Sequence, residues 1–440
     1  MNVSINRSND ALIYAFSSAL TRGALLALSA TSYILLTPQD LKMLGILISF
    51  SPLFTYLLDL ALSKTVIRFW YENHTDKISF YIHSLVQTRF IFYLILSPVI
   101  AIVFYKLWPI LAPDDFLPIL SIISLIFFGL AESSSLLISA FCRLLEKPIA
   151  LLKFKIFALF TALFISILSV LLGFHYLSFV LFSFCYLLIS FLILIRFFFN
   201  NKKKHMINFD MIVPRKDILV FSGPLMIHDI SWWLKGFAMS IIVSIYANPV
   251  LSSAFFLSVM IVAPFYILIS GFDQAYAADF YKAKSIDANL KFIRDKYRLI
   301  IFVQFIFLII FIFARIIKNF LVSDEIALIV MDILPILFLG PVFQSAYVVW
   351  IKPLMHMKKT ALIGVCSFSI SLSAFLTCYF LYPTFGIYFA AIITSSAIIT
   401  IAISMLLISV YKKYSHLDVI YPLSICTASA TLVIFSYIFI

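Results

Sequence analysis

Apolar segments of about 20 residues recur along the whole chain, and short polar stretches separate them. A helix needs about 20 apolar residues to cross the hydrocarbon core of a bilayer. The composition points the same way, because 63% of the residues are hydrophobic, 12% are charged and the mean hydropathy is +1.10. Soluble domains are roughly half apolar, so a fold surrounded by water could not bury this much apolar surface. We therefore expect an all-α polytopic membrane protein.

Twelve segments are long and apolar enough to span a membrane, and the polar residues before the first one do not resemble a removable signal peptide. The predicted spans are 11–36, 42–63, 86–107, 116–140, 154–173, 176–199, 217–246, 251–277, 297–317, 325–350, 360–381 and 385–411. A thirteenth apolar stretch, 419–440, is either a further span or a helix on the membrane surface.

The basic residues set the expected orientation of these spans. Of the 32 Lys and Arg residues, Arg22 and Lys235 fall inside spans, and most of the others share one side of the membrane. That side includes Lys64, Arg89 and Lys155. The opposite side holds only Lys42, Lys106, Arg315 and Lys318. Because Lys and Arg collect in cytoplasmic loops, we expect a cytoplasmic N-terminus, and topology explains the net charge of +12 without a nucleic-acid partner.

Two halves with the same plan are expected on either side of a basic segment. The expected parts are an N-terminal lobe at 1–199, the basic linker at 200–216, a C-terminal lobe at 217–413 and a tail at 414–440. The second helix of each half ends in a similar stretch, LDLALSK with Asp59 and FDQAYAA with Asp273. Six spans per half give both halves the same orientation. A pseudo-two-fold axis would then run along the membrane normal, with a central cavity between the lobes.

Motifs of soluble enzymes are absent from the sequence. It contains neither the phosphate-binding patterns GxGxxG and GxxxxGK[ST] nor the zinc motif HExxH. The five cysteines stand singly in apolar segments, which predicts buried thiols rather than disulfides or metal ligands. We therefore expect no cofactor, no metal and no enzymatic activity, and movement of a substrate instead. A membrane-embedded glycosyltransferase or polymerase is the less favoured alternative, because the predicted outside loops are short.

Ionisable residues inside spans are functional candidates, because a charge in hydrocarbon needs a partner. Arg22 lies about halfway along the first span, and Ser18 and Ser29 lie on the same helical face. This arrangement predicts an arginine that lines a polar cavity. The alternative is a buried arginine that pairs with a neighbouring acid for structural reasons.

The stretch MIHDISWWLKGF in the seventh span carries both an acid and a base, Asp229 and Lys235. Six residues apart, they differ by about 9 Å in height and point in different directions from the helix. Each therefore needs a partner elsewhere, and Arg22 is the expected partner of Asp229. Trp233 shares the face of Asp229 and is expected at the cavity wall. His228 is either a proton relay or a packing histidine.

The remaining acids in spans are interpreted by their depth. Asp59 and Asp273 lie near cytoplasmic helix ends, where structural roles are favoured. Glu132, in the sequence GLAESSS, either lines the cavity or joins helices by hydrogen bonds. Asp332 lies close to the outer face, where we expect solvent to reach it. The predicted cavity residues are thus Arg22, Lys235, Asp229, Ser18, Ser29, Trp233 and Glu132. The candidates for coupling transport to protons are His228, Asp229 and Glu132.

Three stretches resemble motifs of a known family. YLLDLALSKTVIRFW resembles its Asp-Leu-Gly-Leu stretch followed by a basic residue and an aromatic, with Ala61 where glycine is common. LLISAFCRLLEKP resembles its pattern of small residues, Leu/Arg and a turn. YPTFGIYFAAIITS resembles its Pro-x-x-Gly-Ile-x-Gly-Ala run, with Phe389 at the second glycine. The family is the polysaccharide flippases of the multidrug/oligosaccharidyl-lipid/polysaccharide (MOP) exporter superfamily, which includes the O-antigen translocases of Gram-negative bacteria.

The resemblance implies a V-shaped pair of six-helix lobes in the bacterial inner membrane. It implies a transporter that moves undecaprenyl-pyrophosphate-linked oligosaccharide units to the outer leaflet by alternating access, for O-antigen or similar lipopolysaccharide biosynthesis. The implied partners are this lipid-linked oligosaccharide, membrane lipid and the polysaccharide polymerase machinery. Arg22 and Lys235 would be counter-charges for the pyrophosphate. The alternative is a drug/cation antiporter of the same superfamily, which would favour an acidic cavity.

Overall fold

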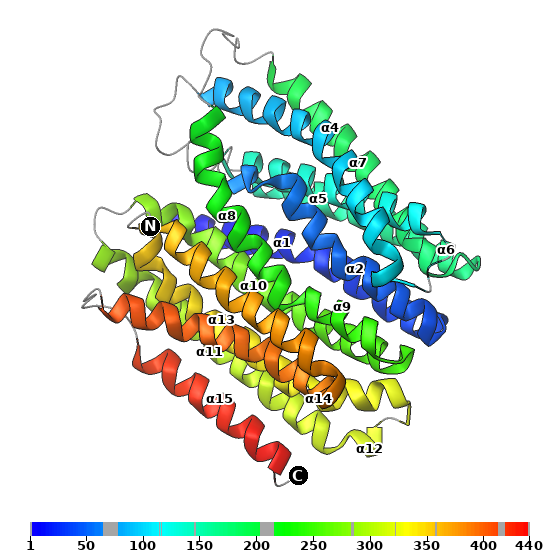
Figure 1. Cartoon of the computed structure of the whole chain (residues 1–440). Coiled ribbons are helices and arrows are strands. Elements are labelled where there is room, and N and C mark those ends of the chain that lie inside the picture. The colour runs from blue at the N-terminus through cyan, green and yellow to red at the C-terminus, as the bar shows by residue number, and fades with distance from the viewer. Residues whose placement is uncertain are drawn as a thin grey trace. The chain divides into compact units, whose positions relative to one another are not determined.

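The structure is a computed structural model of the chain (Figure 1). It describes residues 2–64, 78–113, 115, 117–144, 147–202, 215–282, 286–321, 323–356, 359–411 and 419–438. Within these ranges, the side chains outside the description include Ser18 and those of residues 2–12, 78–88, 197–202, 215–221, 272–282 and 286–296.

Each predicted span corresponds to a helix or to two consecutive helices. The long helices are α1 (Asn2–Leu35), α2 (Pro38–Asp59), α4 (Ile78–Leu111), α5 (Pro118–Leu144), α6 (Pro148–Leu171), α7 (Ser178–Lys202), α8 (Arg215–Lys235), α9 (Phe237–Tyr246), α10 (Pro249–Lys282), α11 (Ile286–Ile316), α13 (Glu325–His356), α14 (Thr360–Tyr411) and α15 (Ile420–Ile438). Two short elements, η2 (His175–Leu177) and α12 (Lys318–Leu321), lie between them. The described residues contain no strand, so the all-α prediction is confirmed.

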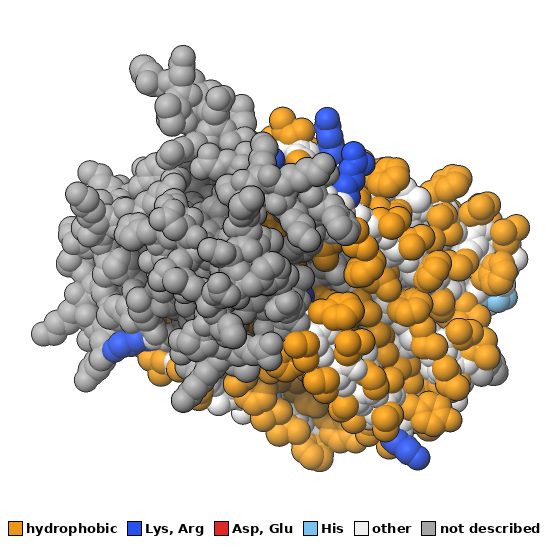
Figure 2. All heavy atoms as spheres, turned by 90° about the horizontal axis from the view of Figure 1, so that it is seen from above, with side chains coloured by type: hydrophobic (Ala, Val, Ile, Leu, Met, Phe, Trp, Pro, Cys, Tyr) orange, Lys and Arg blue, Asp and Glu red, His pale blue; other side chains and the backbone are white. Residues whose placement is uncertain are grey.

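The helices have the length and the surface of membrane spans. In the part of the chain that the structure describes, ten helices are long and apolar enough to cross a membrane, and α15 is one of them. Large apolar side chains such as Ile34, Phe164 and Phe380 are exposed, and hydrophobic side chains cover most of the described surface in Figure 2. Water would not tolerate so extensive an apolar surface, whereas lipid does. The chain is therefore a multi-pass membrane protein.

The chain divides into two compact units. The first unit is Ala27–Trp233, in which α5 packs against α2, α4, α6 and α7. The second unit is Met1–Leu26 with Leu234–Ile440, in which α13 packs against α10, α11, α14 and α15. The unit boundaries fall inside α1 and α8, and the lobe boundaries drawn from the sequence stay a prediction.

Two irregularities shape α2. Pro52 lacks the N–H that would bind the carbonyl of Ile48, and the Ser51 hydroxyl donates to that carbonyl instead, at 2.7 Å. The helix ends at Asp59, after which Leu60 and Ala61 have φ angles of 48° and 54°. This left-handed region favours glycine, because a Cβ crowds the backbone there. The structure thus gives a physical reason for glycine at the position of Ala61 in the motif that this stretch resembles.

A second break lies within α14. At Gly386 the backbone has φ 71° and ψ −159°, so α14 consists of two helices joined at a kink. Pro383 lies three residues earlier and also interrupts the helical hydrogen bonding. The predicted spans 360–381 and 385–411 correspond to the two arms. Glycine is required at this kink because other residues rarely adopt such a backbone conformation.

Two arginines of α11 hold the two ends of α15. The Arg298 guanidinium lies 5.1 Å from the ring centroid of Tyr421, and the Arg315 guanidinium lies 3.7 Å from that of Tyr437. Arg315 also donates a hydrogen bond to the backbone carbonyl of Ser436. Cation–π contacts of this kind are attractive, most of all where water is excluded. They tie α15 to the second unit, in which it also packs against α13.

Asp332 has protein partners in addition to the solvent that the sequence predicts there. Its side chain is only 17% exposed, and it forms ion pairs with Arg315 and Lys318. The Tyr388 hydroxyl also donates to it, at 3.4 Å. The partners come from α11, α12 and α14, and only the fold brings these helices against α13. A carboxylate close to the membrane surface is therefore neutralised by the protein rather than by water.

We predict that Ala61→Gly stabilises the protein. Relief of left-handed strain is worth about 1–2 kcal/mol, and the added freedom of the unfolded chain takes back about 0.4–1 kcal/mol. The free energy of unfolding in detergent should therefore rise by roughly 0.5–1 kcal/mol. The matched control is Ala428→Gly on an exposed position of α15, which should lower it. Destabilisation by both substitutions would contradict the role given to the turn at Ala61.

Candidate functional site

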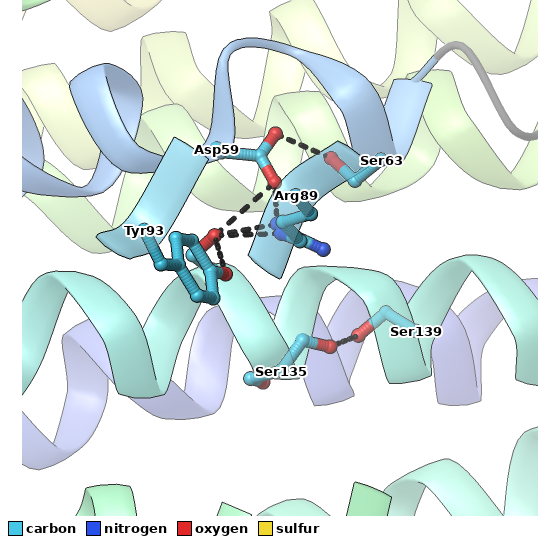
Figure 3. Close-up of polar contacts among 7 residues, drawn as sticks. Asp59, Ser63, Arg89, Tyr93, Ser135 and Ser139 are labelled. Atoms are coloured by element: carbon cyan, nitrogen blue, oxygen red, sulfur yellow. Dashed lines mark hydrogen bonds and ion pairs between the residues drawn. The ribbon is translucent and has the colours of Figure 1, made fainter. Parts of the chain in front are cut away.

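A buried cluster of polar side chains joins α2, α4 and α5 around Asp59 (Figure 3). The Arg89 guanidinium pairs with one carboxylate oxygen of Asp59, and Ser63 Oγ donates to the other at 2.7 Å. Arg89 Nε donates to Ser133 Oγ at 3.1 Å, and the Tyr93 hydroxyl lies 2.5 Å from that same oxygen. The two charged side chains are 3% and 5% exposed, so each depends on the other for neutralisation. This arrangement fits a structural role for Asp59, which stays a prediction.

A second cluster joins α5, α6 and α7 around Glu132. Lys155 Nζ lies 3.3 Å from Glu132 Oε2 and donates to the Tyr186 hydroxyl at 3.2 Å. The Tyr186 hydroxyl donates in turn to Glu132 Oε2 at 2.5 Å. The side chain of Lys155 is 3% exposed and that of Glu132 is 16% exposed. Glu132 therefore joins helices in this structure, while its roles in the cavity and in coupling stay predictions.

Arg89 and Lys155 have acidic partners that the charge pattern of the sequence does not indicate. Both side chains are buried, and each is paired with an acid within the helix bundle. In the sequence, a lone cation near the end of a span looks like a loop residue. Its acid lies on another helix, 30 residues away for Arg89 and 23 for Lys155, and only the fold brings the two together. The expected cytoplasmic side of these residues stays a prediction.

Asp229 and Trp233 attach α8 to α2 within the first unit. The Lys64 ammonium forms an ion pair with Asp229, and the side chains are 48% and 12% exposed respectively. One helical turn later, Trp233 Nε1 donates to the backbone carbonyl of Ser49 at 2.8 Å. The Trp233 ring also lies 5.9 Å from the ring of Phe50, centroid to centroid. The structure thus gives Asp229 a partner, Lys64, that the charge pattern had counted only as a cytoplasmic residue.

His228 forms a hydrogen bond with a neighbour on its own helix. Trp232 Nε1 donates to His228 Nε2 at 3.1 Å. An indole nitrogen can only donate, so that imidazole nitrogen carries no proton while the bond stands. A proton arriving there would have to displace the indole. The geometry fits a packing histidine in this state, and the proton-relay role stays a prediction.

Arg22 and Lys235 both lie in the second unit, at the break between α8 and α9. Lys235 ends α8 and is 1% exposed, Gly236 has non-helical angles (φ −115°, ψ −91°), and α9 begins at Phe237. Arg22 Cζ lies 4.9 Å from the centroid of the Phe237 ring. Its Nη1 atom is buried and has no hydrogen-bond partner among the described residues. Arg22 thus lies against the first residue of α9, and Lys235 precedes that residue by two positions.

The other predicted residues are less informative. Ser29 is buried on α1. The side chains of Ser18 and Asp273 lie outside the described residues. The expected pairing of Arg22 with Asp229 stays a prediction, because the two residues belong to different compact units.

Among the acids whose side chains the structure describes, each one that lies within a helix beyond its first turn has a basic partner in its own unit. The pairs are Asp59 with Arg89, Glu132 with Lys155, Asp229 with Lys64, and Asp332 with Arg315 and Lys318. Nothing in the sequence marks Lys64, Arg89 and Lys155 as members of these clusters. These residues could have been predicted from the rule that a buried acid needs a cation. For each acid in a span, the candidates are the basic residues nearest the ends of the spans.

The fold is similar to those of solved membrane transporters. The similar structures include a MATE crystallised in complex with MaL6, at a TM-score of 0.63 and 14% identity over 97% of each chain. They include the lipid II flippase MurJ in an inward closed conformation, at 0.64 and 18% over 98% of this chain and 92% of that one. A third is a MOP superfamily transporter from Pyrococcus furiosus, at 0.60 and 14% over 94% of this chain and 97% of that one. No protein-family model and no curated protein matches the sequence.

These identities are too low to establish more than a shared fold, but the likeness extends over nearly the whole chain. The chain has the fold of MOP superfamily transporters. The resemblance found in the sequence is thus confirmed at the level of the superfamily fold. The choice between its branches depends on the chemistry of the residues described above.

We predict that Lys155→Met destabilises the first unit strongly. Removing one member of a buried ion pair leaves the other charge without compensation, which costs roughly 3 kcal/mol or more. The double variant Lys155→Met with Glu132→Gln should recover most of that loss, because no unpaired charge remains. Unfolding titrations of the purified protein would measure both. Equal loss in the single and the double variant would contradict the pairing.

Proposed function

We propose that this protein moves a lipid-linked oligosaccharide, carried on undecaprenyl pyrophosphate, from the cytoplasmic to the outer leaflet of the bacterial inner membrane. The N-terminus is cytoplasmic in this proposal, and transport proceeds by alternating access between two six-helix lobes. The cargo supplies O-antigen or a similar surface polysaccharide, and the polymerase machinery receives it. Residues 1–199 and 217–413 form the lobes in this account.

The observation that carries the proposal is the positive charge at the break between α8 and α9. Arg22 lies over Phe237, which follows Lys235 by two residues, and one guanidinium nitrogen of Arg22 has no hydrogen-bond partner among the described residues. The N-terminus of α9 adds the partial positive charge of the helix dipole. A pyrophosphate bears several negative charges and many acceptor oxygens, which two cations and a helix N-terminus can satisfy together. Helices interrupted inside the membrane place their N-termini toward anionic groups in other transporters.

The paired acids argue against a cationic drug as the substrate. A cation-binding site needs a carboxylate that is free to receive the substrate. The acids described within the helices, beyond their first turns, are each already paired with a basic residue. By fold alone, the similar MATE structures support a drug/cation antiporter equally well, and MurJ, a lipid II flippase, supports a lipid-linked cargo. The similar Pyrococcus furiosus transporter is described with a binding pocket of reverse polarity that suggests a different function.

The apolar and polar parts of such a cargo need different surroundings. The polyprenyl tail can stay in lipid, while the sugar hydroxyls need hydrogen-bonding partners such as the buried serines of α1. Asp229, Glu132 or His228 would couple transport to an ion gradient. Two of these residues are acids that pair with a basic side chain, Asp229 with Lys64 and Glu132 with Lys155.

Replacement of either cation tests the proposal. We predict that Arg22→Ala and Lys235→Ala each weaken the binding of undecaprenyl pyrophosphate by roughly 10- to 100-fold, because a charge-assisted hydrogen bond is worth about 1.5–3 kcal/mol. Binding would be measured on purified protein in nanodiscs. Surface polysaccharide should fall in cells that carry either variant at normal protein levels.

Matched variants make this test specific. Lys359→Ala removes an exposed lysine of the second unit and should leave the affinity unchanged. Arg22→Lys keeps the charge and should retain part of the binding. Unchanged affinity in both alanine variants, or tighter binding of the cationic dye ethidium than of the lipid pyrophosphate, would overturn the proposal in favour of a cation antiporter.

A further inference from the structure

We infer that the Lys64–Asp229 ion pair is a latch between α8 and the segment that directly follows α2, and that a pyrophosphate opens it by taking Lys64 from Asp229. Lys64 would then be a cargo-contacting residue that the sequence motifs do not indicate. The inference rests on the proposed function, because it requires an anionic cargo. All the contacts that carry it lie within the first unit.

One face of α8 carries the latch and a second attachment to the first unit. Asp229 and Trp233 are four residues apart, so both side chains project toward α2 from the same side. Asp229 pairs with Lys64, and Trp233 donates to the carbonyl of Ser49 while its ring lies against Phe50. Loss of the ion pair would remove one of these two attachments and leave this face of α8 held by Trp233.

The two partners in the ion pair are unequally accessible. The Lys64 side chain is 48% exposed, whereas that of Asp229 is 12% exposed. An anion can therefore reach the ammonium before the aspartate leaves it. Ion pairs with an exposed member are weak, because water competes for the charge. A pyrophosphate offers more negative charge and more acceptor oxygens than one carboxylate, so it competes effectively for the same ammonium.

Lys64 is held in place on the α2 side of the latch. The left-handed residues Leu60 and Ala61 turn the chain directly before it. Asp59, at the start of that turn, is fixed by Arg89 and by the Ser63 hydroxyl. The lysine backbone is therefore anchored to a buried cluster that spans α2, α4 and α5 (Figure 3). When the ion pair opens, α8 is the partner that moves.

The order of the cations along α8 connects the latch to the proposed site. With α8 starting at the cytoplasmic side, Asp229 comes before Lys235 by six residues, or about 9 Å along the axis. A pyrophosphate that enters from the cytoplasm meets Lys64 at Asp229 before it reaches Lys235. Opening of the latch then frees the helix that carries Lys235. Cargo entry and movement of α8 would thus be coupled by competition for one lysine.

The test measures the distance between α8 and α4 by double electron–electron resonance. Spin labels are attached at Ile227→Cys on α8 and Ile102→Cys on α4, two exposed positions, in a chain whose five native cysteines are replaced by alanine. Undecaprenyl pyrophosphate should add a second distance population, and neutral undecaprenol should not. Inorganic pyrophosphate separates the headgroup from the lipid, because a response to it alone means that the headgroup is sufficient.

Variants of the latch should change affinity in opposite directions. Asp229→Asn removes the competing carboxylate, so it should show the second population without lipid and bind undecaprenyl pyrophosphate several-fold more tightly. Lys64→Met should bind it about tenfold more weakly, which corresponds to the loss of one charge-assisted contact. Lys64→Arg should restore binding. The control is Lys147→Met, an exposed lysine of the first unit, which should behave as the wild type.

The outcomes separate the latch from the function on which it rests. If the lipid pyrophosphate binds but the distances stay unchanged, the latch is overturned and the proposed function stands. If Asp229→Asn and Lys64→Met weaken binding equally, the pair is only structural and the latch is also overturned. If the lipid pyrophosphate does not bind at all, both proposals fail. The titration of the labelled chain with intact Lys64 and Asp229 decides the question even if a variant does not fold.

Discussion

The cost of placing a charge where no water can solvate it governs this structure. Lipid offers an ionised side chain no hydrogen bond, so each charge in a span must be neutralised by the protein or by a ligand. The described helices meet this requirement with ion pairs that join different elements. Arg89 connects α4 to α2, and Lys155 connects α6 to α5. Apolar side chains and serines pack around these pairs.

The same requirement identifies the part of the molecule that is available for function. The acids described within the helices beyond their first turns are paired, and positive charge accumulates where α8 gives way to α9. Arg22 rests on an aromatic ring rather than on a described carboxylate. The fold is shared with a lipid II flippase and with MATE structures, and we propose from this balance of charge that the cargo has an anionic headgroup. In the proposed latch, such a headgroup releases α8 from Lys64.

The sequence predicts the helices well, because the span length and the apolar periodicity are local properties. It predicts even the break near Gly386, where a proline and a glycine interrupt an apolar run. It does not predict which charges meet, since those contacts depend on tertiary packing. The partners of Arg89, Lys155 and Asp332 are therefore not apparent from the sequence, although the structure pairs each of these residues with an opposite charge. Arg22 and Lys235 stand out in advance because they lie in mid-span, where no loop could account for them.

The central claim is that positive charge at the α8–α9 break selects a pyrophosphate-bearing lipid as the cargo. The most direct measurement is flipping in proteoliposomes that contain the purified protein and a fluorescent oligosaccharide linked to undecaprenyl pyrophosphate. Loss of fluorescence on addition of an impermeant quencher reports the fraction of lipid in the outer leaflet. The account predicts flipping by the wild type, none with Arg22→Ala combined with Lys235→Ala, and no uptake of ethidium by the same vesicles. Ethidium uptake driven by an ion gradient, with no movement of the lipid, would contradict it.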